Sequence, residues 1–105
     1  MPPYTPFDIR GHVHAFQTLF PSLTTENALE RIAATSGIPK EKLKCKERDA
    51  HTVVWRQAFF YTVRERSGKG YGAIAEAHAP EHPGANVRNG YETIKSHLET
   101  YGNNA

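Results

Sequence analysis

Lysine and arginine side chains are concentrated in the middle of the chain, where they can bind a polyanion. Residues 40–69 carry nine Lys or Arg and four Asp or Glu, a local balance of +5, whereas the rest of the chain carries four basic and seven acidic side chains. A basic segment in an otherwise acidic chain indicates a surface for phosphates, although a solvated helix face followed by a loop has the same composition. The candidate phosphate-binding residues are Lys44, Lys46, Arg48, Arg56, Arg64 and Lys69.

A second group of candidate residues follows a Pro-Gly turn near the C-terminal end. Residues 71–79 and 85–101 show two helical patterns, separated by a five-residue break, residues 80–84, that contains Pro80 and Pro83. Proline cannot continue a helix, but it suits the first turn of a new one. Two helices joined by a tight turn are typical of a DNA-reading helix-turn-helix, and an ordinary helical hairpin gives the same pattern. The candidate base-reading residues, in the first turns of the second helix, are Asn86, Arg88 and Asn89.

The other reactive side chains do not form a catalytic or metal-binding set. Cys45 lies between two lysines, which favours its thiolate, but no partner base accompanies it. His78 and His82 have the i, i+4 spacing of two zinc ligands on a helix, and Pro80 interrupts that helix. No CxxC motif or nucleophile–base pair occurs. We therefore expect neither an enzyme nor a metal or cofactor.

Helices must position these candidates, because the chain shows helical periodicity and no alternating strand pattern. Apolar residues recur at helical spacing in residues 8–20, 24–36 and 50–66, a short helical segment is expected at residues 38–43, and residues 44–49 form a basic loop. The aromatic-rich segment 50–66 exceeds the usual length of a strand, so we predict a buried helix there. The predicted fold is an all-α, compact domain of five to six helices. Its expected core contains Val54, Trp55, Phe59, Ile74, Val87 and Ile94.

Length and composition favour one intracellular domain, residues 1–105. The chain is 38% hydrophobic and 23% charged, as in ordinary globular domains. A single cysteine cannot form an internal disulfide, which favours a reducing, cytoplasmic setting. No apolar run approaches the roughly 20 residues of a membrane span, and no secretory signal is evident, so we expect no membrane partner.

A longer pattern of apolar, arginine and glutamine positions extends over residues 27–99. It consists of Leu29, Ile32, Ala33, Ile38, Leu43, Arg48, Val53, Arg56-Gln57, Ile74-Ala75, Val87 and Ile94. This pattern resembles the C-terminal DNA-binding domain of the bacterial replication initiator DnaA, an all-helical helix-turn-helix domain similar to the Trp repressor. The resemblance implies a double-stranded DNA-binding core at residues 24–101, after an N-terminal extension, residues 1–23, that contains one amphipathic helix.

The resemblance also implies roles for three of the candidate residues. In this family an arginine in a basic loop enters the minor groove, and eight residues later an Arg-Gln pair opens a long helix and contacts phosphate and bases. Arg48, Arg56 and Gln57 have that spacing. The flexible guanidinium of Arg48 can follow a narrow, negative minor groove, and the planar guanidinium of Arg56 fits phosphate or a guanine edge.

Two departures limit what the resemblance implies. The family usually begins its recognition helix with an acid, a histidine, two hydroxyl residues and a valine, whereas Val87 follows Pro-Gly-Ala-Asn at residues 83–86. DNA binding is therefore implied more directly than the family's own DNA sequence. The chain also lacks the Walker-type phosphate loop of the DnaA ATPase domain, so we do not expect ATPase activity.

The expected function is sequence-preferring binding of double-stranded DNA by a cytoplasmic, nucleoid-associated regulator of replication or transcription. A protein of the same machinery is a second candidate partner. The alternative is a protein-interaction module that keeps the fold and has lost DNA binding. The basic segment argues against this alternative, and the missing histidine and hydroxyl residues argue for it.

Overall fold

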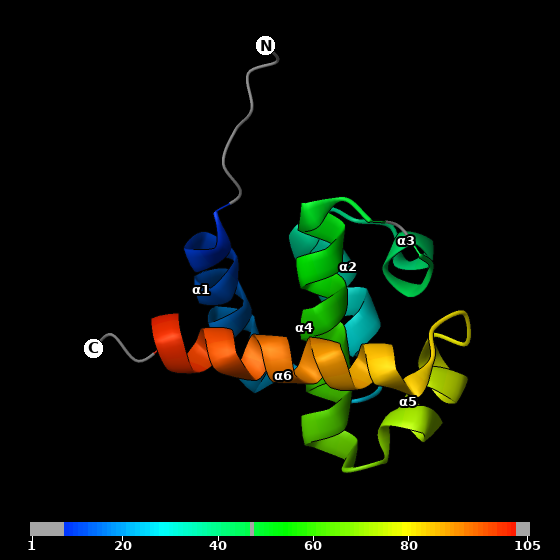
Figure 1. Cartoon of the computed structure of the whole chain (residues 1–105). Helices are drawn as coiled ribbons and strands as arrows, with labels where there is room; N and C mark the ends of the chain where they lie inside the picture. The colour runs from blue at the N-terminus through cyan, green and yellow to red at the C-terminus, as the bar shows by residue number, and fades with distance from the viewer. Residues whose placement is uncertain (1–7, 47, 103–105) are drawn as a thin grey trace.

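The computed structural model describes residues 8–46 and 48–102, which are helical throughout apart from short connections (Figure 1). This part of the chain contains six α-helices, one 3-10 turn and no strand, so the prediction of an all-α domain with five to six helices is confirmed. None of its helices is long and apolar enough to span a membrane. The elements are α1 (Ile9–Leu19), η1 (Phe20–Ser22), α2 (Ala28–Ser36), α3 (Lys40–Lys44), α4 (Ala50–Ser67), α5 (Tyr71–His78) and α6 (Gly84–Tyr101).

Capping residues and glycines set several helix ends close to the predicted boundaries. Asp8 and Asp49 precede α1 and α4, and the carboxylate of each accepts a hydrogen bond from an amide of the first turn, which satisfies a donor that the helix itself leaves unpaired. Gly37 and Gly68 end α2 and α4 with φ angles of 76° and 70°. Glycine enters this left-handed region without the steric cost of a Cβ atom.

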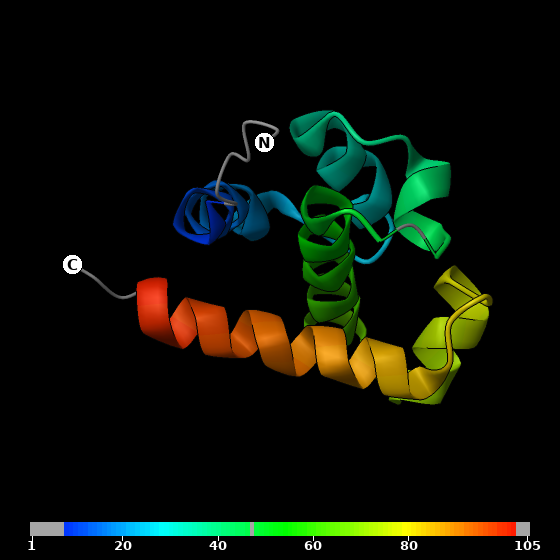
Figure 2. The same cartoon turned by 45° about the horizontal axis from the view of Figure 1, so that its top comes forward.

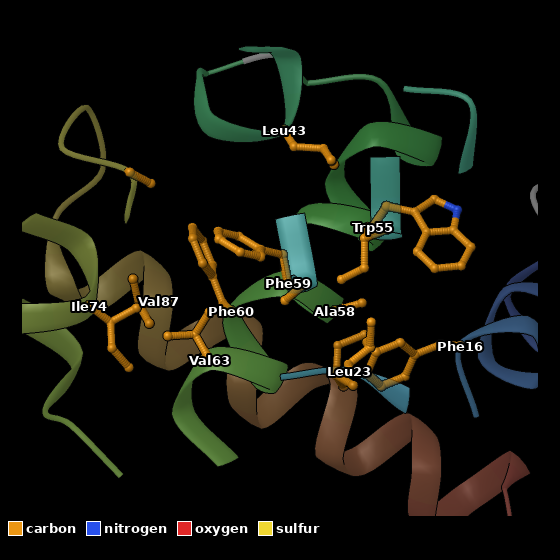
Figure 3. Close-up of a cluster of buried hydrophobic side chains, with 14 of the residues drawn as sticks. Phe16, Leu23, Leu43, Trp55, Ala58, Phe59, Phe60, Val63, Ile74 and Val87 are labelled. Atoms are coloured by element: carbon orange, nitrogen blue, oxygen red, sulfur yellow. The ribbon is translucent and has the colours of Figure 1, made fainter. Parts of the chain in front are cut away.

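The core surrounds α4, which passes through the centre of the molecule while α6 crosses it (Figures 1 and 2). Figure 3 shows large α4 side chains converging with residues of the neighbouring helices. Val54, which was predicted to lie in the core, is only half-buried and borders a small cavity beneath α1. The predicted core residues that are buried are Trp55, Phe59, Ile74, Val87 and Ile94.

Helix α1, predicted as part of an N-terminal extension, packs into this same core. Phe16 is buried in the main cluster, and its ring meets that of Tyr61 edge-on with centroids 5.9 Å apart. The side chain of Gln17 donates a hydrogen bond to the carbonyl of Gly102, at the far end of α6. Residues 8–23 therefore pack as an integral part of the domain.

The crossing of α4 and α6 combines a close backbone approach with a tyrosine pair. A Cβ atom at Gly90 would lie 3.1 Å from the Phe60 ring, so only glycine lets α6 approach this closely without displacing it. Beside this point Tyr61 stacks on Tyr91, with ring centroids 5.2 Å apart, and the Tyr91 hydroxyl donates a 2.6 Å hydrogen bond to Glu65. This hydrogen bond, together with burial, raises the pKa of Tyr91 to about 12.

The first turns of α5 and α6 touch through their backbones. A Cβ atom at Gly84 would lie 2.9 Å from the backbone nitrogen of Gly72 and 3.0 Å from its Cα. Backbone atoms cannot move aside as a flexible side chain does. Gly84 is therefore required by the placement of the two helices, whereas a Cβ atom at Gly72 would point into open space.

Replacing Gly84 by alanine is expected to destabilise the domain by about 1–3 kcal/mol, as overpacking does elsewhere. Gly72→Ala is the matched control, and it should be neutral or stabilise α5 by up to roughly 1 kcal/mol through helix propensity. Urea unfolding followed by circular dichroism measures both changes. Equal effects of the two substitutions would contradict the close backbone contact.

Candidate nucleic-acid interface

Arg56 lies inside the fold and not on the surface where the sequence placed it. Its side chain is 7% exposed, and its Nε and one terminal nitrogen donate hydrogen bonds to the carbonyls of Leu43 and Lys42 at 3.0 and 3.2 Å. These carbonyls lie at the C-terminal end of α3, where no further helix amide can reach them. The guanidinium therefore caps α3 and ties it to α4. Arg56 turns inward because it shares the buried face of α4 with Thr52 and Phe59.

The loop between α3 and α4 leaves Arg48 and Lys46 exposed while its ends are held. At the α4 end, the Asp49 carboxylate accepts hydrogen bonds from the amide and the hydroxyl of Thr52, at 3.0 and 2.9 Å. These hydrogen bonds lower the pKa of Asp49, the amide contributing most, so the cap stays ionised at neutral pH. At the α3 end, Arg56 holds the last carbonyls. Arg48 thus lies in a loop whose two ends are held by hydrogen bonds.

The polar residues predicted at the start of α6 are exposed on two sides of the buried stripe. Asn86 and Asn89 line a cleft of about 150 Å³ that they share with Gln57 of α4. Arg88 lies outside this cleft and forms an exposed ion pair with Glu92 at 3.3 Å. Such a surface pair contributes little to stability, so Arg88 can exchange Glu92 for a phosphate or a base. The amides that line the cleft offer the donors and acceptors that a base edge requires.

Lys44 and Lys69 act on the same histidine, although they come from different segments. Burial lowers the pKa of His78, and the charges of Lys69 and Lys44 lower it further. His78 ends α5, where its ring meets Phe59 edge-on with centroids 5.8 Å apart. Lys44 is half-buried and Lys69 exposed, so the two lysines extend the positive surface beside the helix pair. Arg64 lies over the Tyr71 ring at 4.7 Å and donates hydrogen bonds to backbone carbonyls of the loop before α5.

His82 is the residue at this surface whose position the sequence did not reveal. The sequence spacing pairs it with His78 as a possible helical zinc motif, but the two rings pack against different residues, His78 on Phe59 and His82 on Phe60. His82 is buried and hydrogen-bonds to Cys45. Among the described residues, no group of three or more potential metal ligands occurs. A histidine between two prolines in the turn was the only signal in the sequence.

Comparisons of the chain with protein-family models, with curated proteins and with solved structures find no match. The surface formed by the α3–α4 loop and the first turns of α6 carries exposed cations on the loop, and amides and an arginine on the helix. Lys44 and Lys69 lie at its edge. This arrangement suits a ligand that offers both phosphates and base edges.

Replacing Arg56 by alanine is expected to lower the free energy of unfolding by about 1.5–3 kcal/mol, since buried carbonyls lose a charged donor. Arg48→Ala, in the exposed part of the same loop, is the matched control and should leave the unfolding free energy nearly unchanged. Urea titration of both variants tests the difference. An Arg56→Ala protein as stable as the parent would show that the guanidinium does not cap α3.

Proposed function

We propose that this protein binds double-stranded DNA with a sequence preference and serves as a regulator of replication or transcription without ATPase activity. The proposal rests on one observation above others. The loop that carries the exposed Arg48 begins at Cys45, and the buried His82 ring joins the Cys45 carbonyl to Asn86 at the exposed start of α6. The resemblance to the DnaA C-terminal DNA-binding domain, which also places these two features together, supports the same function.

The roles of the residues follow from their exposure and chemistry. Arg48 enters the minor groove, whose narrow form carries an enhanced negative potential. Lys44, Lys46 and Lys69 contact phosphates, which position the protein without selecting a sequence. Arg56 also lines the cleft beside Asn86 and Asn89, but it is assigned no phosphate contact because its guanidinium donates hydrogen bonds to the carbonyls that end α3.

Base reading is assigned to α6 and to the neighbouring edge of α4. Arg88 suits guanine, because a guanidinium can donate two hydrogen bonds to its major-groove edge, and the amides of Asn89 and Gln57 suit adenine. Arg88 and Asn89 flank the buried Val87 and Gly90 of α6. Because this reading set contains no histidine or paired hydroxyls, the preferred DNA sequence is proposed to differ from that of the DnaA family.

The Arg48→Ala variant is expected to weaken duplex binding by about 1–3 kcal/mol and to reduce the dependence of log K on log salt by about one unit, as one contact to the duplex is lost. Fluorescence anisotropy with a duplex selected from random DNA, in rising salt, measures both quantities. Arg10→Ala is the matched control. It removes the same charge near Tyr101, at the other end of α6, about 27 Å from its start at 1.5 Å per residue.

Parent protein that does not bind duplex DNA at low salt would exclude the proposed function and leave the protein-interaction module as the better interpretation. Arg48→Ala and Arg10→Ala variants with equal losses would show that binding follows net charge alone. Neither result depends on the stability of the variants, because both arginines are exposed.

Alanine at Arg88 or Asn89 should change which duplexes are preferred. Each base contact is expected to discriminate between base pairs by about 1–3 kcal/mol, whereas a lost phosphate contact weakens all sequences alike. The measurement compares each variant on the selected duplex and on random duplex, with Lys69→Ala as a phosphate-contact control. Equal losses on the two duplexes would reassign Arg88 and Asn89 to the DNA backbone.

A further inference from the structure

His82 joins the basic loop to the helix pair through both nitrogens of its ring. Nε2 lies 2.7 Å from the carbonyl oxygen of Cys45, and Nδ1 lies 3.0 Å from the side-chain nitrogen of Asn86. A carbonyl oxygen only accepts, so Nε2 carries the proton and Nδ1 accepts from the amide. The residue is 7% exposed, and its ring meets Phe60 edge-on. Both ring nitrogens are therefore engaged within the fold.

The two partners of His82 belong to different parts of the proposed interface. Cys45 is the first residue after α3 and begins the loop that carries Arg48, whereas Asn86 lies in the first turn of α6. Asp49 fixes the other end of the loop to α4. The His82 ring adds a link from the loop to the start of α6, and so helps to set the distance between the two DNA-contacting elements.

We propose that His82 is a positioning residue, which holds Arg48 and the start of α6 at the separation needed to contact one DNA duplex at the same time. This inference rests on the proposed function. Two contacts carried by one rigid body bind more tightly than the same contacts on segments that must first be ordered. Asn86 then orients the His82 ring, and Arg88 and Asn89 read the bases.

Three variants separate positioning from packing. His82→Phe keeps a ring beside Phe60 and removes both hydrogen bonds. His82→Gln supplies an amide that can donate to Cys45 and accept from Asn86. Asn86→Ala removes only the hydrogen bond that orients the His82 ring. If His82→Phe does not fold, Asn86→Ala replaces it in the binding measurements. Circular dichroism establishes folding before each full-length variant is titrated with the selected duplex at fixed low salt.

We expect His82→Phe to weaken binding about fivefold or more and His82→Gln to retain most of the affinity. The decisive protein is the double variant of Arg48→Ala with His82→Phe. Adding Arg48→Ala to His82→Phe should cost less than about twofold, because the arginine has already lost its place and the two effects are coupled. Losses that multiply would overturn the positioning role, since His82 would then act independently of Arg48.

The link itself is measured without DNA, from the NMR shifts of the ring nitrogens. A proton on Nε2 and protection of the ring from solvent are expected, and a proton on Nδ1 would overturn the link to Cys45. Failure of the parent to bind duplex DNA would overturn the proposed function instead. The outcomes for His82 and for DNA binding are therefore distinguishable.

Discussion

Helix α4 has to bury large side chains on several sides at once, and the other helices are placed to meet that requirement. Trp55 lies against α1, Phe59 against α5 and Phe60 against the turn before α6. Full burial of one such side chain contributes about 1.5–3 kcal/mol, so each neighbouring element is held by a substantial apolar contact. A helix buried over so wide an arc forms a rigid support, from which the basic loop and α6 take their positions.

Two arginines eight residues apart have opposite surroundings, one buried and one exposed. Arg56 lies against the C-terminal carbonyls of α3, where the negative end of the helix dipole favours a cation. Arg48 remains exposed. The +5 balance of residues 40–69 therefore overstates the charge available to a ligand, because part of it stabilises the fold.

The sequence predicted the helices well because their signals are local, such as the left-handed Gly68 after α4. Helix α2 begins at Ala28, later than predicted, because the Thr24 hydroxyl accepts a hydrogen bond from the Asn27 amide and closes a separate turn. The exposure of Arg88 and Asn89 could be predicted from their positions off the apolar stripe. The burial of Arg56 and His82 could not, because both bind backbone carbonyls distant in sequence, and a carbonyl leaves no trace in residue type.

The tyrosine pair at the α4–α6 crossing sets an alkaline limit on the fold. Tyr91 has a pKa of about 12 in the folded protein because its hydroxyl donates to Glu65, compared with 10.0 for an ordinary tyrosine. The neutral phenol therefore contributes its full stability below pH 10, and this contribution is lost as the pH rises from 10 to about 12. Deprotonation of Tyr91 at alkaline pH is thus expected to weaken the α4–α6 crossing, which also positions the helix proposed to read DNA.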